Sequence, residues 1–295
     1  MSIFPFKKKI KSKIESELRK LPWDVDSEKI IQLLEPTIGI KTKKISSKIG
    51  IGKSKFGGFP DLVKEVEWPN LNGFPFAFLG QINLSEIKFD KFNSLPENGL
   101  LLFFFSTNQD DYQYENLKDM HRVIFIENLS NLEQRNYPEK YSDLAKFNEC
   151  EIEYFEQFSL PSYQNYKILD LNFTDEDDNL LFEASEIINE LTSAGEDIGH
   201  QILGNAQAVQ GDVNYPWALQ SIGHKLKTLS ELNITDQNRV LENQKNIRLL
   251  LQIDMSDNTP NFSGFGASGG IYFGIAEKDL ANGNFENTYF ELQNS

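Results

Sequence analysis

The fold is decided by two stretches of the sequence, Phe78-Leu79-Gly80-Gln81-Ile82-Asn83-Leu84 and Leu249-Leu250-Leu251-Gln252-Ile253-Asp254-Met255. Each consists of an apolar run, a glutamine, an isoleucine, an amide or carboxylate residue and a final apolar residue. Each is followed, at nearly equal spacing, by a glycine that opens another apolar run, Gly99 in the first case and Gly269 in the second. The matched order predicts duplicated supersecondary units that pack about a pseudo-two-fold axis. A chance similarity between two pairs of apolar strands is the alternative.

Other periodic segments complete the expected fold. Strands are expected at residues 38–51, 76–84, 100–107, 121–127, 151–158, 247–255, 271–276 and 289–292, and helices within 1–20 and at 27–35 and 179–192. Because strands predominate and few alternate with helices as βαβ units, the sequence predicts an α+β fold with mainly antiparallel sheets, an internal duplication and N-terminal helices. We expect a single domain, 1–295, with a basic helical segment at about 1–38 and repeat copies at about 39–160 and 161–295.

Composition limits the compartment of the protein. The chain has 295 residues, 39% of them hydrophobic, and one cysteine, Cys150. A single cysteine excludes a disulfide framework and is typical of a reducing compartment, so we expect a cytoplasmic protein. Cys150 alternates with apolar residues and is interpreted as a packed strand residue.

Charge is distributed unevenly along the chain. The net charge is −15, but residues 1–55 hold 14 Lys and Arg against 6 Asp and Glu, and the remaining residues hold 15 against 38. An acidic body repels phosphate backbones, so no nucleic-acid partner is expected. The same charge favours a basic protein partner, for example a nuclease-like toxin neutralised by an immunity protein.

The basic N-terminal segment has one narrow apolar stripe. Ile10, Ile14 and Leu18 recur at four-residue spacing among lysines, which predicts an amphipathic helix. We interpret it as a surface helix that docks on the core. The alternative is weak contact of residues 1–20 with a membrane surface, to which each lysine would contribute about 1 kcal/mol.

The two repeated stretches each carry polar residues on one face. Side chains alternate along a strand, so Gln81 and Asn83 share a face in the first copy, as Gln252 and Asp254 do in the second. One prediction is that each glutamine hydrogen-bonds to neighbouring backbone groups. The other is that these four side chains converge in a polar, ligand-binding cleft between the copies.

Two loops supply further candidate ligand-binding residues. His200, Gln210 and Asp212 belong to a polar, glycine-containing segment after a predicted helix. We interpret His200 as a helix cap or loop hydrogen-bonding residue, with a general base as the alternative. Ser54 and Lys55, with Gly57 and Gly58, lie in a glycine-rich segment that could cradle an anion, although its spacing is not that of a phosphate-binding P-loop.

Metal and catalytic sites are not predicted. The three histidines and the cysteine are widely separated and have no ligand spacing, so neither a metal ion nor another cofactor is expected, and no catalytic residue is assigned. The leading prediction is therefore a non-enzymatic binding or interaction protein, with the question of enzymatic activity open. A small-ligand binder or enzyme that uses the polar cleft is the alternative.

Several motifs together resemble a known family. The matching segments are Ser54 to Pro60, Trp68-Pro69, Phe76 to Leu84, Leu95-Pro96 with Gly99 to Phe105, His200 to Asp212, Leu249 to Asp254, Phe265 to Ile275, Asp279-Leu280 and Phe285 to Gln293. In this order they resemble the YwqG-like family, bacterial proteins that contain a domain of unknown function. The resemblance implies a duplicated α+β fold and a cytoplasmic location, and it brings no established activity.

Overall fold

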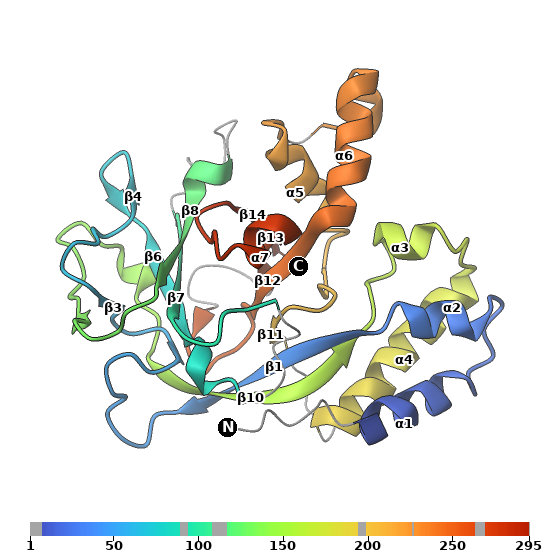
Figure 1. Ribbon diagram of the computed structural model, residues 1–295, viewed down its shortest axis with the longest axis horizontal. Helices are drawn as coiled ribbons and strands as arrows, with labels where there is room; N and C mark the ends of the chain where they lie inside the picture. Colours follow the sequence, from blue (N-terminus) through green and yellow to red (C-terminus); the bar gives the residue numbers. More distant parts are fainter. Residues whose placement is uncertain are drawn as a thin grey trace.

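One antiparallel sheet of ten strands organises the molecule (Figure 1). A computed structural model describes residues 8–88, 94–107, 117–193, 199–225, 227–262 and 269–294. Along the sheet the strands are β14 (Thr288–Asn294), β13 (Gly269–Ala276), β12 (Ile247–Asp254), β11 (His200–Ile202), β1 (Glu35–Lys44), β10 (Cys150–Ser159), β2 (Lys55–Phe56), β6 (Ala77–Asn83), β7 (Leu100–Phe105) and β8 (His121–Ile126). Two short pairs lie outside this sheet, β3 (Asp61–Leu62) with β9 (Glu133–Gln134), and β4 (Asn70–Leu71) with β5 (Phe74–Pro75).

The strands follow in sequence order on both sides of the central pair, β1 and β10. From the centre outward, β1 is followed by β11, β12, β13 and β14, and β10 is followed by β2, β6, β7 and β8. The central pair brings Lys41 opposite Glu153. The register is irregular between Phe78 and Gly80 on one side and between Leu249 and Leu251 on the other. We group the strands by their order in the sequence. The first strand set is β1, β2, β6, β7 and β8, and the second is β10 to β14. In the sheet, β1 lies beside β11 of the second set and β10 lies beside β2 of the first.

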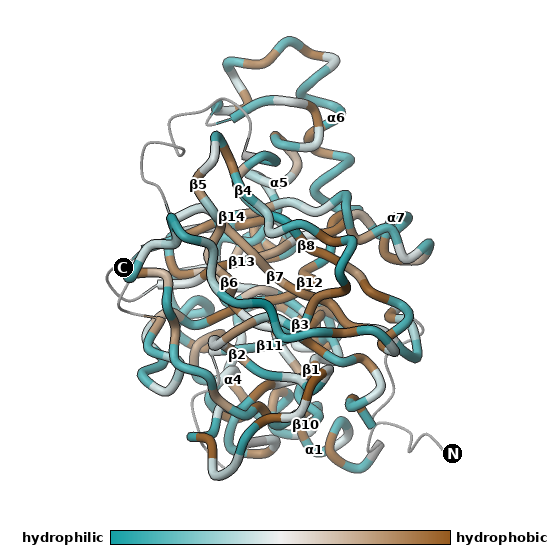
Figure 2. Tube along the Cα trace, turned by 90° about the vertical axis from the view of Figure 1, so that its left-hand side faces the viewer, coloured by the Kyte–Doolittle hydropathy of each residue, from teal (hydrophilic) through white to brown (hydrophobic). Residues whose placement is uncertain are grey.

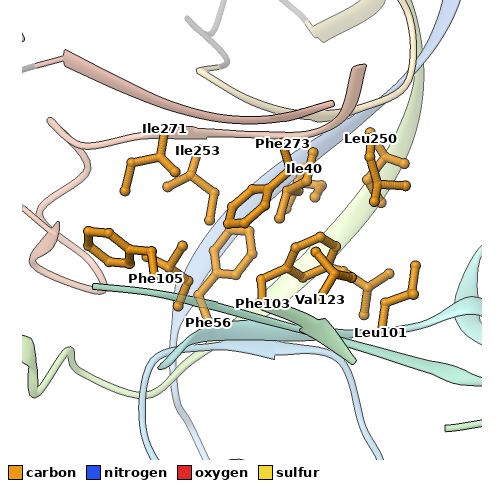
Figure 3. Packing of buried hydrophobic residues seen from close by; sticks show 14 of the residues in the cluster. Ile40, Phe56, Leu101, Phe103, Phe105, Val123, Leu250, Ile253, Ile271 and Phe273 are labelled. Atoms are coloured by element: carbon orange, nitrogen blue, oxygen red, sulfur yellow. The ribbon is translucent and has the colours of Figure 1, made fainter. Parts of the chain in front are cut away.

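The sheet curls until it is nearly closed into a barrel. Its two edge strands meet where His121 Nε2 lies 2.9 Å from Thr288 Oγ1. Inside, Phe103 of the first set and Phe273 of the second make an edge-on ring contact at 5.1 Å. Figure 3 shows side chains from the two walls pointing toward one another across this interior. Burying each large apolar side chain contributes roughly 1.5–3 kcal/mol, so this interior is the main source of stability.

Apolar residues cover the outer faces of the strands as well. On the first set, Phe78, Leu102 and Phe104 pack into an outer cluster beneath the β3–β9 region. On the second set, Trp217 packs with Leu249 of β12 and with other apolar residues. Figure 2 shows hydrophobic segments gathered among the central strands. Because both faces are covered, these strands are nearly continuous apolar runs, which is why their sequence signal is strong.

Helices α1 (Lys8–Leu18), α2 (Ser27–Gln32) and α4 (Asp175–Ser193) form a layer at one end of β1 and β10 (Figure 1). The apolar stripe of α1 is used within the protein, since Ile14 and Leu18 are fully buried in a cluster that includes residues of α4. The interpretation of a docked surface helix is confirmed, and that stripe is not available to a membrane surface. Residues 1–7, also part of the proposed membrane contact, lie outside the described residues. None of the helices described is long and apolar enough to cross a membrane.

An acidic run, Asp175 to Asp178, forms the first turn of the long helix α4. Helix α4 begins at Asp175, four residues earlier than expected. Asp177 is buried and accepts hydrogen bonds from the backbone N–H groups of Thr174 and Asp24, at 3.1 and 2.9 Å. Carboxylates in a first helical turn are stabilised by the helix dipole. The run thus caps α4 and ties it to the segment between α1 and α2.

Sequence patterns predicted the long apolar strands and the amphipathic helices, but they missed the short and the mostly polar elements. The coarse class is confirmed, a mixture of helices and strands with a large antiparallel sheet. β1 begins at Glu35, earlier than expected, and ends at Lys44. Elements that were not predicted include β11, the helices α3 (Tyr166–Leu169), α5 (Asn214–Ser221), α6 (Ile234–Asn246) and α7 (Glu277–Ala281), and 3-10 turns at Leu84–Glu86, Leu117–Met120, Asp143–Ala145 and Leu229–Glu231. In α6 only Val240 and Gln244 are buried, so the helix lacks a clear apolar period.

Candidate functional site

A cavity of about 430 Å³ lies between helix α4 and the second strand set. It is lined by Gln157, Phe158, Ser159, Leu160, Phe182, Ser185, Glu186, Ile188, Asn189, Gly199, Gln201, Gln207, Val209, Gln252, Ile253, Asp254, Ser256, Gly269, Gly270 and Tyr272. We call this cavity the amide pocket, because four of these residues are glutamines. Its volume is within the range of small-molecule sites, roughly 300–1,000 Å³.

Three of the glutamines are held in place by the backbone around them. Gln252 accepts a hydrogen bond from the N–H of Gln207 at 2.8 Å and donates one to the carbonyl of Gly199 at 2.9 Å. Gln201 donates to the carbonyl of Asn205 at 2.7 Å, and Gln207 donates to that of Leu160 at 2.8 Å. These bonds fix the orientation of the amides, so the wall of the pocket is preorganised.

Gln157 of β10 has an acceptor with no partner. Its Nε2 donates to Asn189 Oδ1 of α4 at 3.0 Å. Its Oε1 is buried and, within the described part of the chain, accepts no hydrogen bond. The side chain is 5% exposed and lines the amide pocket. Leaving such an oxygen without a donor costs about 1–3 kcal/mol.

The charge of the pocket is one-sided. Glu186 of α4 and Asp254 at the end of β12 contribute carboxylates, and no Lys, Arg or His occurs among the described lining residues. One carboxylate oxygen of Asp254 accepts from the backbone N–H and the hydroxyl of Ser256, at 2.8 and 2.6 Å. Phe182 and Val209, which are 70% and 51% exposed, add apolar surface to the same lining.

His200 lies beside the pocket but belongs to a structural hydrogen-bond network. Its Nδ1 accepts from the backbone N–H of Asp254 at 3.0 Å, and its Nε2 lies 2.9 Å from Asp257 Oδ2. The ring is 4% exposed and packs against Phe56. With both ring nitrogens engaged, His200 is not free to act as a general base. It belongs to a strand, where a helix cap or loop residue was expected, although its hydrogen-bonding role is as expected.

Asp257 is stabilised as a carboxylate by this network. Burial alone would raise its pKa, but hydrogen bonds from His200, from the Thr42 hydroxyl and from the Thr259 backbone hold the pKa well below its usual range. Thr42 Oγ1 donates at 2.6 Å and so ties the central strand β1 to the segment after β12.

Gln81 and Asn83 do not line the amide pocket. Gln81 is fully buried and hydrogen-bonds to Asp61 and to the carbonyl of Lys53. Asn83 donates to the carbonyl of Gly52 at 2.6 Å, and its backbone N–H donates to Ser54 Oγ at 2.8 Å. Of the four residues expected to converge, the pocket therefore contains Gln252 and Asp254 alone. Gln81 and Gln252 both bond to backbone groups, as the first prediction proposed.

Ser54 and Lys55 are both engaged in contacts inside the protein. Ser54 Oγ also accepts from the Tyr154 hydroxyl at 2.8 Å. Lys55 is 1% exposed, and its Nζ lies 2.8 Å from Glu149 Oε1 and 4.0 Å from Asp61 Oδ1. The charge that was expected to attract an anion is thus compensated by two internal carboxylates.

Gly57 and Gly58 form a tight turn. Their φ angles are +62° and +69°, a region that L side chains rarely adopt. A Cβ on Gly57 would lie 2.1 Å from the carbonyl oxygen of Asn148, and one on Gly58 would meet the Glu149 side chain at 2.8 Å. The positive φ angles and the close approach to Asn148 and Glu149 explain why glycine occupies both positions, without a bound anion.

Asp212 and Gln210 also lie away from the lining of the pocket. Asp212 accepts hydrogen bonds from Asn165 Nδ2 at 2.8 Å and from the backbone N–H of Tyr215, at the start of α5, at 3.3 Å. Burial raises its pKa despite these bonds. Gln210 is exposed, and its backbone N–H donates to Gln293 Oε1 at 3.0 Å. These contacts describe a helix start and a loop anchor.

Cys150 is a packed strand residue, as its alternation with apolar residues predicted. Cys150 is a fully buried residue of β10, and burial raises the pKa of its thiol to about 12, so it is not a reactive thiolate. Within the described ranges, no group of three His, Cys, Asp or Glu residues is arranged to hold a metal ion.

Most of the pocket lining was not predicted from the sequence, including Gln157 and Glu186. Both lie in correctly predicted elements, a strand and a helix, but nothing in the local sequence indicates that these elements face each other. Gln157 has no distinct signal of its own, since the end of β10 also carries the polar residues Glu156 and Ser159.

Fold and site together define an α+β protein with a nearly closed antiparallel sheet and a polar pocket between that sheet and a helix. The chain belongs to the family described as domain of unknown function DUF1963, whose sequence model matches residues 54–293. The match runs from the residue before β2 into β14, and it leaves the central strand β1 outside. No curated protein matches the sequence.

Proposed function

We propose that this protein binds a small polar molecule in the amide pocket. The observation that carries the proposal is the buried Oε1 of Gln157, which has no hydrogen-bond donor among the described residues. A bound ligand with a donor group would satisfy this oxygen. The glutamines already fixed by backbone contacts support the proposal, since preorganised polar groups bind a ligand at a smaller entropic cost.

Filling the pocket tests this function. Ser185 lines it from α4 and is half-buried, so Ser185→Phe would occupy part of the cavity. Saturation-transfer NMR with a defined mixture of amino acids, polyols, organic acids and amines should give signals for at least one compound with the natural protein. We expect that signal to be lost in Ser185→Phe.

A matched control uses the same helix. Glu190 is exposed and is not part of the lining, so Glu190→Phe adds an aromatic ring outside the pocket. This variant should retain the signal. The proposal is wrong if no compound binds the natural protein, or if both variants bind equally well.

We also propose that the two strand sets descend from an internal duplication. Their identical order and their corresponding glutamines support it, and they favour copies at 35–126 and 150–294 over the boundaries expected from sequence. A basic protein partner, such as a toxin neutralised by its immunity protein, remains a prediction from charge. Membership of the YwqG-like group and a cytoplasmic location likewise remain predictions.

A further inference from the structure

We infer that the ligand of the amide pocket is a protonated primary amine on a short apolar chain. This inference rests on the proposed function and adds the chemical class of the ligand. It is carried by the charge of the lining, by the acceptor of Gln157, and by the residue that fills the corresponding position of the first strand set.

The lining attracts positive charge. Glu186 and Asp254 contribute carboxylates, and the described lining contains no basic side chain to neutralise them. Among the described residues Glu186 makes no ion pair. A site with two carboxylates and no internal cation favours a cationic ligand and repels an anionic one.

The Gln157 acceptor selects the kind of cation. Its Oε1 needs an N–H or O–H donor at hydrogen-bond distance. A primary ammonium group has three such donors, whereas a quaternary ammonium group has none. A protonated primary amine can therefore satisfy Gln157 and a carboxylate at once.

The first strand set holds an ammonium group at the corresponding position. Lys55 pairs with Gln81 across β2 and β6, as Gln201 pairs with Gln252 across β11 and β12. The buried ammonium of Lys55 lies beside Glu149 and Asp61. The second set has the neutral Gln201 there, next to an open cavity. An amine from solution would supply the charge that Lys55 supplies internally.

Apolar residues of the lining suit a hydrocarbon chain. Phe182 is 70% exposed on α4, and Val209 is 51% exposed in the segment after β11. Methylene groups of a short amine would cover these side chains. The ring of Phe182 also offers a face to a cation, and the exposure of the ring makes this contribution a small one.

Three probes of equal length test the inference. We would titrate the full chain with 1,5-diaminopentane, 1,5-pentanediol and glutarate at low salt by isothermal calorimetry. The diamine should bind, and the diol and the dianion should bind at least tenfold more weakly. Equal binding of diol and diamine would overturn the inference but leave a polar pocket ligand in place.

Variants locate the binding. Glu186→Gln should weaken diamine binding about threefold, since the side chain is exposed, and Asp254→Asn about tenfold. Gln157→Leu should also weaken it several-fold. Glu190→Gln removes the same charge from α4 outside the lining and should leave the affinity unchanged. Unchanged affinity in all three pocket variants would overturn the inference. Absence of binding by any probe or metabolite would overturn the proposed function as well.

Discussion

Gln81 and Gln252 make the same two backbone hydrogen bonds in opposite strand sets. Each accepts from an N–H of the segment after the neighbouring short strand, Asp61 at 3.0 Å and Gln207 at 2.8 Å. Each donates to a carbonyl just before that strand, Lys53 at 2.8 Å and Gly199 at 2.9 Å. Each glutamine thus ties together the two ends of the strand paired with it.

The two glutamines should both be needed for stability, but unequally. Gln81→Leu would leave buried backbone groups without partners and would also remove a donor to Asp61 Oδ2 at 2.6 Å. Gln252→Leu would leave only backbone groups without partners, the N–H of Gln207 and the carbonyl of Gly199. At about 1–3 kcal/mol per buried group left unpaired, we expect losses of about 3 and 2 kcal/mol in the free energy of unfolding.

Urea denaturation measures both losses. Gln210→Leu is the matched control, because that residue is exposed and contributes a backbone contact; its stability should change by less than about 0.5 kcal/mol. A Gln81 variant as stable as this control would contradict the role assigned to the glutamine.

The buried Lys55 should be far more important than the exposed Lys53. Lys55→Met leaves the carboxylates of Glu149 and Asp61 without their cation, and breaking a buried pair in this way costs about 3–5 kcal/mol. Lys53 is 60% exposed and pairs with Glu86, so Lys53→Met should cost less than about 1 kcal/mol. Thermal unfolding of both variants tests the difference, and equal losses would show that the Lys55 ion pairs are not structural.

Glu291 of β14 should make the protein less stable as the pH rises. Burial raises its pKa from 4.5 to about 7, although Lys225 nearby acts in the opposite direction. Between these values the folded state binds a proton that the unfolded chain has lost, so this group's contribution to stability decreases from about pH 4.5 to pH 7. At pH 8, the free energy of unfolding of Glu291→Gln should therefore exceed that of the natural protein by about 2 kcal/mol.

The pH dependence of that gain is the check. Urea denaturation of both proteins at pH 4 and pH 8 should give a larger difference at pH 8, with little or none at pH 4. A difference independent of pH would mean that Glu291 titrates in the folded protein as it does in the unfolded chain.

The strands of the barrel could be predicted because their residues are apolar on both faces. β7 is entirely buried, and its composition alone indicates a strand. β11 could not be predicted, since three residues, His200 to Ile202, give no measurable period. Helix α6 is long enough to show a period, but it was not predicted because it is mostly exposed and has no apolar face.

Only part of the candidate site could be predicted. Strand alternation tells which residues of one strand share a face, but not which distant elements pack against that face. Gln252 and Asp254 share a face of one strand, as expected, and both line the pocket. Gln81 and Asn83 share a face too, but their partners are the loop segments at Lys53 and Gly52. Gln157 and Glu186 were missed because only the packing of α4 beside β10 brings them to the same cavity.

A crystal structure of the protein soaked with 1,5-diaminopentane tests the central claim most directly. We predict the diamine in the amide pocket, with one nitrogen about 3 Å from Gln157 Oε1 and within reach of Glu186 or Asp254. A pocket that holds water alone at Gln157, in crystals equilibrated with an excess of the diamine, would contradict the account.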